Sequence, residues 1–258
     1  MQPLPYCGFP PSPGELLGRF NLDPVLMGVL FAFALAQFLS MEDRRSRTFA
    51  VCGWLAAAVA FISPLCALSV SLFSARIAQH MILLLIAAPL IALGWPRWNV
   101  GARSLWMTSI AFMAALWGWH MPTPYDATFS STALYWSMHI TLFGSGILLW
   151  RELVYHPTRR SGLVLLIGLL TSIHMGLLGA ILALARRPLF LPHFTTTQIW
   201  GLTPLQDQQL GGTLMWVPGM ALFLWVSIRS LRRLWNALEG TPPAKHVNQH
   251  ESHPARIS

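Results

Sequence analysis

Seven long apolar runs, separated by short polar segments, constrain this chain more than any other feature. They cover about residues 22–41, 49–69, 76–95, 103–120, 132–150, 162–185 and 212–230 of the 258 residues. A helix that crosses a bilayer needs about 20 apolar residues, and only 10% of this chain is charged, against about a quarter in a soluble protein. The sequence therefore predicts an all-α fold, a polytopic membrane bundle of seven transmembrane helices over residues 24–230. An irregular, proline-containing arm is expected at 1–23 and a disordered tail at 231–258.

Basic residues between the apolar runs predict how the bundle is oriented. Thirteen of the 17 Lys and Arg residues fall on one side, in the 40–48, 96–103 and 151–161 loops and in the tail. The other side holds only Arg19, Arg76, Arg186 and Arg187. Because short cytoplasmic loops carry the excess of Arg and Lys, we expect the N-terminus outside and the C-terminus in the cytoplasm. The net charge of +8 therefore indicates topology, and no nucleic-acid partner is expected.

Four histidines lie in or at the end of predicted helices, and each has a methionine neighbour. The couplets are His80-Met81, His120-Met121, Met138-His139 and His174-Met175. In the predicted orientation His80 lies about one turn, His139 about 10 Å and His174 about 15 Å below the outer end of its helix, with His120 at the outer surface. An imidazole in hydrocarbon is costly and usually functional. We therefore expect all four in the outer half of one bundle.

Imidazole and thioether ligands together suit copper, above all Cu(I). The expected site takes His80, His139 and His174 from three helices, because adjacent residues of a helix point about 100° apart and a couplet seldom gives both ligands to one ion. The full set of candidate metal ligands is His80, His139, His174, His120, Met81 and Met175. The alternative stays open that these histidines hydrogen-bond across helices while the methionines pack in the core.

Asp126 and Asp207 are the only acidic residues in the outer loops between predicted helices. Each is a candidate for orienting a metal-binding histidine, as carboxylates do around metal sites. A turn or capping role is the alternative. No Asp or Glu lies in the middle of a predicted helix, which argues against a proton relay of carboxylates.

The three cysteines, Cys7, Cys52 and Cys66, form no CxxC pair. Cys52 and Cys66 are predicted on one helix about 21 Å apart, too far for a disulfide. A bond between Cys7 and Cys66 requires that both face the oxidising side. Free thiols are the favoured prediction.

Several motifs follow one another in order over roughly residues 70–225. They are Gln79-His80-Met81 with Ala87-Ala88-Pro89-Leu90, His120-Met121-Pro122, His139 with Gly146 and Trp150, His174-Met175-Gly176, Asp207-Gln208-Gln209-Leu210-Gly211-Gly212, and Met215-Trp216-Val217-Pro218-Gly219. This set resembles the CtaG family of cytochrome c oxidase assembly factors, the type associated with caa-type oxidases. One departure is Arg76, which stands where many relatives have a second histidine one turn before His80.

The resemblance implies a multi-pass protein of the plasma (inner) membrane that is not an enzyme. It implies support for the assembly of haem-copper cytochrome c oxidase, with copper bound or delivered at the outer face of the membrane. The implied partners are oxidase subunits, a copper chaperone and the lipid bilayer. Two alternatives stay open: a scaffold for an oxidase subunit without metal, and a redox protein that binds b-type haem or quinone.

Overall fold

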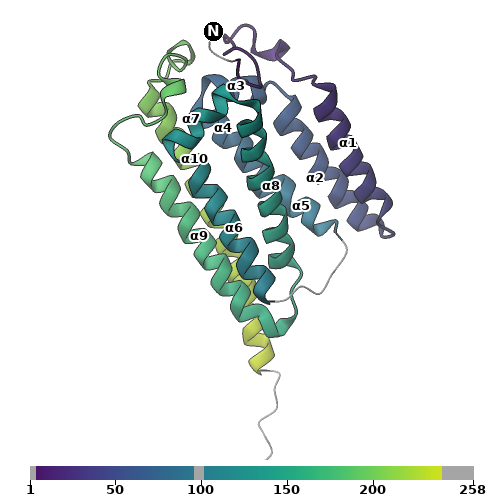
Figure 1. The fold of residues 1–258 in the computed structure, drawn as a ribbon. Helices are drawn as coiled ribbons and strands as arrows, with labels where there is room; N and C mark the ends of the chain where they lie inside the picture. Colours follow the sequence, from purple (N-terminus) through teal and green to yellow (C-terminus); the bar gives the residue numbers. More distant parts are fainter. Residues whose placement is uncertain (1–3, 96–101, 240–258) are drawn as a thin grey trace, which may run out of the picture.

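The computed structural model describes residues 4–95 and 102–239, and every regular element in this part of the chain is helical (Figure 1). The predicted all-α fold is therefore confirmed. Six long helices are α1 (Pro24–Leu39), α2 (Arg44–Ile62), α6 (Ala102–Trp119), α8 (Thr132–Val154), α9 (Ser161–Ala183) and α10 (Pro204–Glu239). A further rod consists of α4 (Phe73–Met81), the π-helix η2 (Ile82–Ala87) and α5 (Ala88–Leu93). The shorter helices are α3 (Leu65–Ser71) and α7 (Pro122–Ser130), and the 3₁₀ turns are η1 (Leu16–Gly18), η3 (Thr158–Arg160), η4 (Leu191–His193) and η5 (Gln198–Trp200).

The outside of the bundle is apolar. Large side chains such as Phe31, Leu55, Ile140 and Ile173 are exposed on its helices. Four rods among the described residues are long and apolar enough to cross a membrane, namely Arg44–Ile62, Phe73–Leu93, Thr158–Ala183 and Pro204–Glu239. Many large apolar side chains exposed on long apolar helices are stable against lipid rather than water. The architecture is that of an integral membrane protein.

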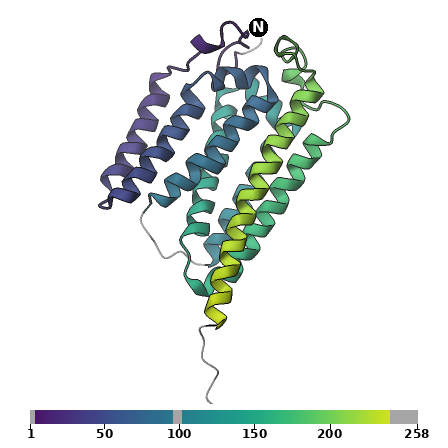
Figure 2. The same cartoon turned by 180° about the vertical axis from the view of Figure 1, so that it is seen from behind.

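The rod formed by α4, η2 and α5 lies in the middle of the bundle and packs against α2, α8 and α10 (Figures 1 and 2). The long pair α9 and α10 forms one side, and α1 with α2 forms the other. Buried residues of the rod, including Ile77, Leu84 and Ala88, join Phe112 of α6 and Met138 of α8 in one core cluster. Polar residues on this rod therefore face protein rather than lipid.

Several helix boundaries differ from the prediction. The Ser63-Pro64 pair separates α2 from α3, as proline does at a helix start. The prediction that Cys52 and Cys66 share one helix is therefore wrong. Residues expected in outer loops are helical, because Pro122–Ser130 forms α7 and α10 begins at Pro204. The same helix continues to Glu239, past the start of the expected tail, and residues 240–258 lie outside the described part.

The N-terminal arm is fastened to the bundle by a disulfide between Cys7 and Cys66, whose Cα atoms are 5.5 Å apart. The prediction of free thiols is therefore wrong for these two residues, whereas Cys52 is free. Next to the disulfide, the Tyr6 hydroxyl donates to the Asp23 carboxylate at 2.6 Å. The Tyr6 ring stacks on Tyr135 of α8, with ring centroids 4.8 Å apart. The arm thus covers the ends of α3 and α8.

Candidate metal centre

Three histidine rings, two from helices and one from the turn after a third helix, adjoin in the interior of the bundle. His80 lies near the end of α4, His139 in α8, and His120 directly after α6. The ring centroid of His80 is 5.5 Å from that of His120 and 5.3 Å from that of His139. The exposed fraction is 1% for His80, 3% for His120 and 2% for His139. His80 is therefore the central member of a buried histidine cluster, defined here as His80, His120 and His139.

The hydrogen bonds of this cluster fix two of its tautomers. His120 Nδ1 lies 2.6 Å from the Leu116 carbonyl oxygen, and His139 Nδ1 lies 2.9 Å from that of Tyr135. A carbonyl oxygen only accepts hydrogen bonds, so both Nδ1 atoms carry the proton. Each Nε2 then presents a lone pair. Both Nε2 atoms, and both ring nitrogens of His80, are buried without a hydrogen-bond partner in the described residues.

These orphaned nitrogens are expensive, since each buried polar atom without a partner costs about 1–3 kcal/mol. Imidazole nitrogens are also ligands of copper and other late transition metals, and a hydrogen bond from the second ring nitrogen is what commonly orients a metal-binding imidazole. The donor types therefore fit a metal. In the described residues, however, no group of three His, Cys, Asp or Glu side chains is placed to hold an ion as the rings now stand.

The other predicted ligands have different surroundings. The His174 ring contacts Trp117 of α6 edge-on at 6.3 Å, and no contact with a ring of the histidine cluster is found in the described residues. Met81 is buried in the same core as Met175, and the Met175 side chain lies against Gly219 of α10. The structure thus brings together His80 and His139 as expected, with His120 rather than His174 as the third ring.

Asp207 anchors the helix that carries His80. It is fully buried in the first turn of α10 and accepts hydrogen bonds from the backbone nitrogens of Phe73 at 2.6 Å and Ser74 at 3.0 Å, and from the Ser74 hydroxyl. Its carboxylate therefore caps the N-terminus of α4, where the helix dipole favours negative charge. No hydrogen bond from Asp207 to a histidine is found in the described part of the chain.

Asp126, the other predicted partner of a histidine, lies in α7 and is partly buried. Burial raises the pKa of its carboxyl group. One of its oxygens, Oδ1, is buried without a hydrogen-bond partner in the described residues. No contact between Asp126 and the histidine cluster is found there either.

Arg76 is a functional candidate that the sequence alone did not reveal. It lies one turn before His80 in α4 and is only 1% exposed. Its guanidinium group donates to the Thr128 hydroxyl at 2.8 Å and lies over the Phe129 ring at 4.1 Å. Within the described residues it forms no ion pair. Cation–π contacts with Phe129, Tyr125 and Tyr135 therefore compensate a buried positive charge next to the histidine cluster.

A second residue that the sequence did not single out is His193, which fastens the loop between α9 and α10. Its Nδ1 lies 3.2 Å from the Ser71 carbonyl oxygen and its Nε2 lies 2.7 Å from the Tyr125 hydroxyl. Since the carbonyl accepts, Nδ1 donates and Nε2 accepts from the tyrosine. Burial, and secondarily the charge of Arg76, lowers the pKa of His193 to about 3. The neutral ring therefore holds this loop against α3 and α7.

The π-helix η2 begins directly after His80-Met81. Such wide turns occur often at functional sites and leave carbonyl groups without their usual helical partner. The Trp150 indole nitrogen donates to the Leu84 carbonyl oxygen in this turn at 2.7 Å. One turn earlier, the Gln79 amide donates to the Ala60 carbonyl of α2 at 2.8 Å. Side chains from neighbouring helices thus support the irregular backbone next to His80.

The chain is thus an all-helical membrane bundle with a polar site in its interior, where adjoining histidine rings have nitrogens without a hydrogen-bond partner in the described residues. Residues 29–237 match the family model of the cytochrome c oxidase caa3 assembly factor, CtaG. The chain belongs to this family, which confirms the resemblance seen in its motifs. No curated protein and no solved structure shows a significant match to the chain.

Proposed function

We propose that this protein binds copper at the histidine cluster and supplies it to cytochrome c oxidase during assembly, without catalysing a reaction itself. Membership of the caa3 assembly factor family supports the assembly role and oxidase subunits as partners. The single observation that carries the copper role is the set of buried imidazole nitrogens without partners on His80, His120 and His139. Imidazole suits copper, and a copper chaperone on the outer side would be the donor.

The surrounding residues suit a carrier that must release its cargo. The backbone hydrogen bonds to Nδ1 of His120 and His139 keep Nε2 free to bind. The charge of Arg76, one turn from His80, repels a cation in a low-dielectric interior. We infer that copper is held by favourable ligand bonds against this repulsion, so that its affinity stays low enough for transfer.

The redox alternative has less support from the geometry. A haem with two axial imidazoles needs rings on opposite faces of the macrocycle. The His80 ring meets the rings of His120 and His139 edge to face at 5.5 and 5.3 Å between centroids, which leaves no room for a macrocycle within either pair. The scaffold alternative, without metal, is tested together with the copper proposal.

We further propose that all seven long rods of the described residues cross the plasma membrane, with the N-terminus outside. The excess of basic residues in the loops at the other end supports this orientation. The disulfide gives independent support, because such bonds form in oxidising compartments and Cys7 is joined to Cys66 at the end where α4 begins. The histidine cluster would then lie toward the outer face.

Cysteine labelling in intact cells tests this topology. In a Cys52→Ser background, Ser130→Cys should react with a membrane-impermeant maleimide and Arg159→Cys should not, because both positions are exposed but lie at opposite ends of the bundle. Permeabilised cells provide the control, since both variants should then react. Labelling of position 159 alone in intact cells would reverse the orientation.

Deletion of the gene tests the assembly role. Oxidase activity in the membranes should fall strongly, because the oxidase remains without its copper, and added copper should restore part of it. Oxidase activity and oxidase subunit abundance are measured in the deletion strain with and without copper. A loss that copper never relieves would favour a scaffold, and unchanged activity would contradict the proposal.

A further inference from the structure

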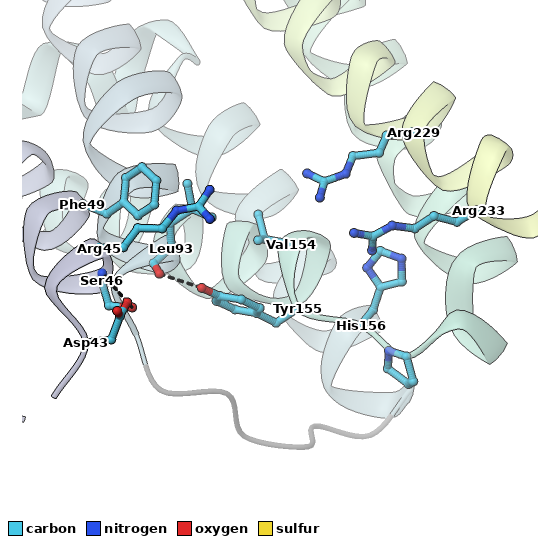
Figure 3. Close-up of a pocket in the computed structure, with 11 residues that line it drawn as sticks. Asp43, Arg45, Ser46, Phe49, Leu93, Val154, Tyr155, His156, Arg229 and Arg233 are labelled. Atoms are coloured by element: carbon cyan, nitrogen blue, oxygen red, sulfur yellow. Dashed lines mark hydrogen bonds between the residues drawn. The ribbon is translucent and has the colours of Figure 1, made fainter. Parts of the chain in front are cut away.

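A pocket of about 760 Å³ opens at the end of the bundle opposite the start of α4. It lies between the first turn of α2, the end of α5, the end of α8 with the residues that follow, and the last part of α10 (Figure 3). The Tyr155 hydroxyl donates to the Leu93 carbonyl oxygen at 2.6 Å and so joins two of its walls. Its volume lies in the range of small-molecule sites. This pocket is independent of the histidine cluster and has no part in the function proposed above.

The pocket carries positive charge that no ion pair among the described residues neutralises, although the Arg45 guanidinium lies over the Phe49 ring at 5.5 Å and that of Arg229 over the Trp225 ring at 5.8 Å. Arg45 of α2 reaches into it from one side, and Arg229 and Arg233 of α10 reach into it from the other (Figure 3). None of the three forms an ion pair within the described residues. Asp43 is the one carboxylate among the described lining residues, and it accepts hydrogen bonds from the Ser46 backbone nitrogen and hydroxyl at 2.9 and 3.0 Å as the cap of α2.

Arg229 and Arg233 also stand one helical turn apart, a spacing at which like charges destabilise a helix. They face the same pocket, with Arg233 close to His156 in the view of Figure 3. An anion bound between them would remove this repulsion. Because an arginine fork matches the geometry of phosphate oxygens, phosphate is the anion that this arrangement favours.

His156 adds a hydrogen-bond acceptor to the site. Its Nδ1 lies 3.0 Å from the Leu153 carbonyl oxygen and therefore donates. Its Nε2 is left with a lone pair, buried and without a partner in the described residues. Burial, and then the charges of Arg233 and Arg229, lower the pKa of this imidazole, so the ring is neutral. It can accept a hydrogen bond from a hydroxyl group of the ligand.

The remaining wall is apolar and includes Phe49, Leu93 and Val154. Beside the pocket, a second hollow of about 460 Å³ shares Arg229 and Arg233 and adds Trp225 and Ile228. Both of these added side chains are exposed on α10, on the surface that lipid would cover. A soluble phosphate gains no binding energy from apolar walls, whereas the acyl chains of a phospholipid can pack against them.

We infer that this pocket binds the headgroup of an anionic phospholipid that carries hydroxyl groups, such as phosphatidylglycerol. Arg45, Arg229 and Arg233 bind the phosphate, and His156 accepts from a headgroup hydroxyl. The acyl chains lie against Trp225 and Ile228. Basic pockets between membrane helices are a known way of holding anionic headgroups. The lipid would join the start of α2 to the end of α10, which are far apart in the sequence.

Native mass spectrometry of the purified full-length chain, with phosphatidylglycerol and phosphatidylcholine added in equal amounts, tests this inference. Wild type should retain phosphatidylglycerol in preference to phosphatidylcholine. In the double variant R229Q/R233Q, the ratio of bound phosphatidylglycerol to bound phosphatidylcholine should fall at least tenfold. R45Q changes a different helix, and the same ratio should fall several-fold in it. It therefore tests the site independently if the double change in α10 impairs folding.

The matched control is R44Q/R159Q, which removes the same charge from exposed positions at the same end that do not line the pocket. It should retain phosphatidylglycerol as wild type does. Equal losses in the control and in R229Q/R233Q would show general surface attraction and overturn the site. Displacement of the lipid by millimolar inorganic phosphate would assign the pocket to a soluble anion instead, and no preference in wild type would overturn it outright.

Discussion

Replacing His80 by alanine is expected to lower cytochrome c oxidase activity in cells to the level of a deletion strain. His80 is the ring that contacts both other members of the histidine cluster, so its removal separates the two that remain. Loss of a residue that only orients a ligand already costs 10–100-fold in metal affinity, and loss of a ligand should cost at least about 100-fold. Oxidase activity, with membrane abundance of the variant measured beside it, gives the result.

His174→Ala is the matched control for this experiment. It also removes a histidine beside a methionine from a membrane helix, but its ring contacts Trp117. Activity should therefore stay near wild type. His120→Ala and His139→Ala should behave as His80→Ala does, and double variants should cost little more, because residues that act as one unit are not additive. Loss in His174→Ala with retention in His120→Ala would point to the triad first expected from the sequence.

Removal of the disulfide is expected to lower the free energy of unfolding by about 4 kcal/mol, from the loop entropy of a link that closes about 60 residues. The relevant pair is Cys7 and Cys66, separated by 59 residues in the sequence. The variant C7S/C66S should also release Tyr6 from Tyr135, a contact that lies next to His139. Thermal unfolding in detergent, with and without reductant, measures the effect.

Cys52→Ser serves as the control, because Cys52 is a free and exposed thiol. It should unfold as wild type does, and reductant should destabilise it equally. C7S/C66S should no longer respond to reductant. If reductant does not change the thermal stability of the wild-type protein, a structural role for this bond is contradicted.

The fold could be predicted from the sequence to the extent that hydropathy determines it. Each apolar run is helical in the described residues, although the run over 49–69 is divided between α2 and α3, because an apolar segment of that length has few other stable states. The ends were less predictable. The segment around Asp207 is polar and was expected in a loop, yet it forms the start of α10. The Asp207 carboxylate accepts from the first backbone nitrogens of α4, a contact that no local pattern reveals.

The position of a histidine along its helix follows directly from the sequence, but the face of the helix on which it lies does not. His174 was predicted at a suitable depth, yet the ring contact that the structure gives it is with Trp117 of α6. His120, just beyond the end of α6, turns inward because its Nδ1 is bound to the Leu116 carbonyl. Rotation of a helix depends on the packing of its neighbours, and a single sequence does not specify it.

Arg76 and the disulfide show the same limitation for contacts distant in sequence. Arg76 was counted as a basic residue of the outer side, but Phe129 and Tyr125 of α7 and Tyr135 of α8 enclose it. Cys7 reaches Cys66 only because the arm folds back over α3 and α8. Neither arrangement follows from spacing, since both require segments that come together only in the folded chain.

The copper content of the purified protein tests the central proposal most directly. After loading with Cu(I) and removal of unbound metal, wild type should hold about one copper ion per chain, because the imidazoles of the histidine cluster together form one site. The triple variant H80A/H120A/H139A should hold none, while H174A should match wild type. Equal copper in wild type and in the triple variant, or no copper in either, would contradict the account.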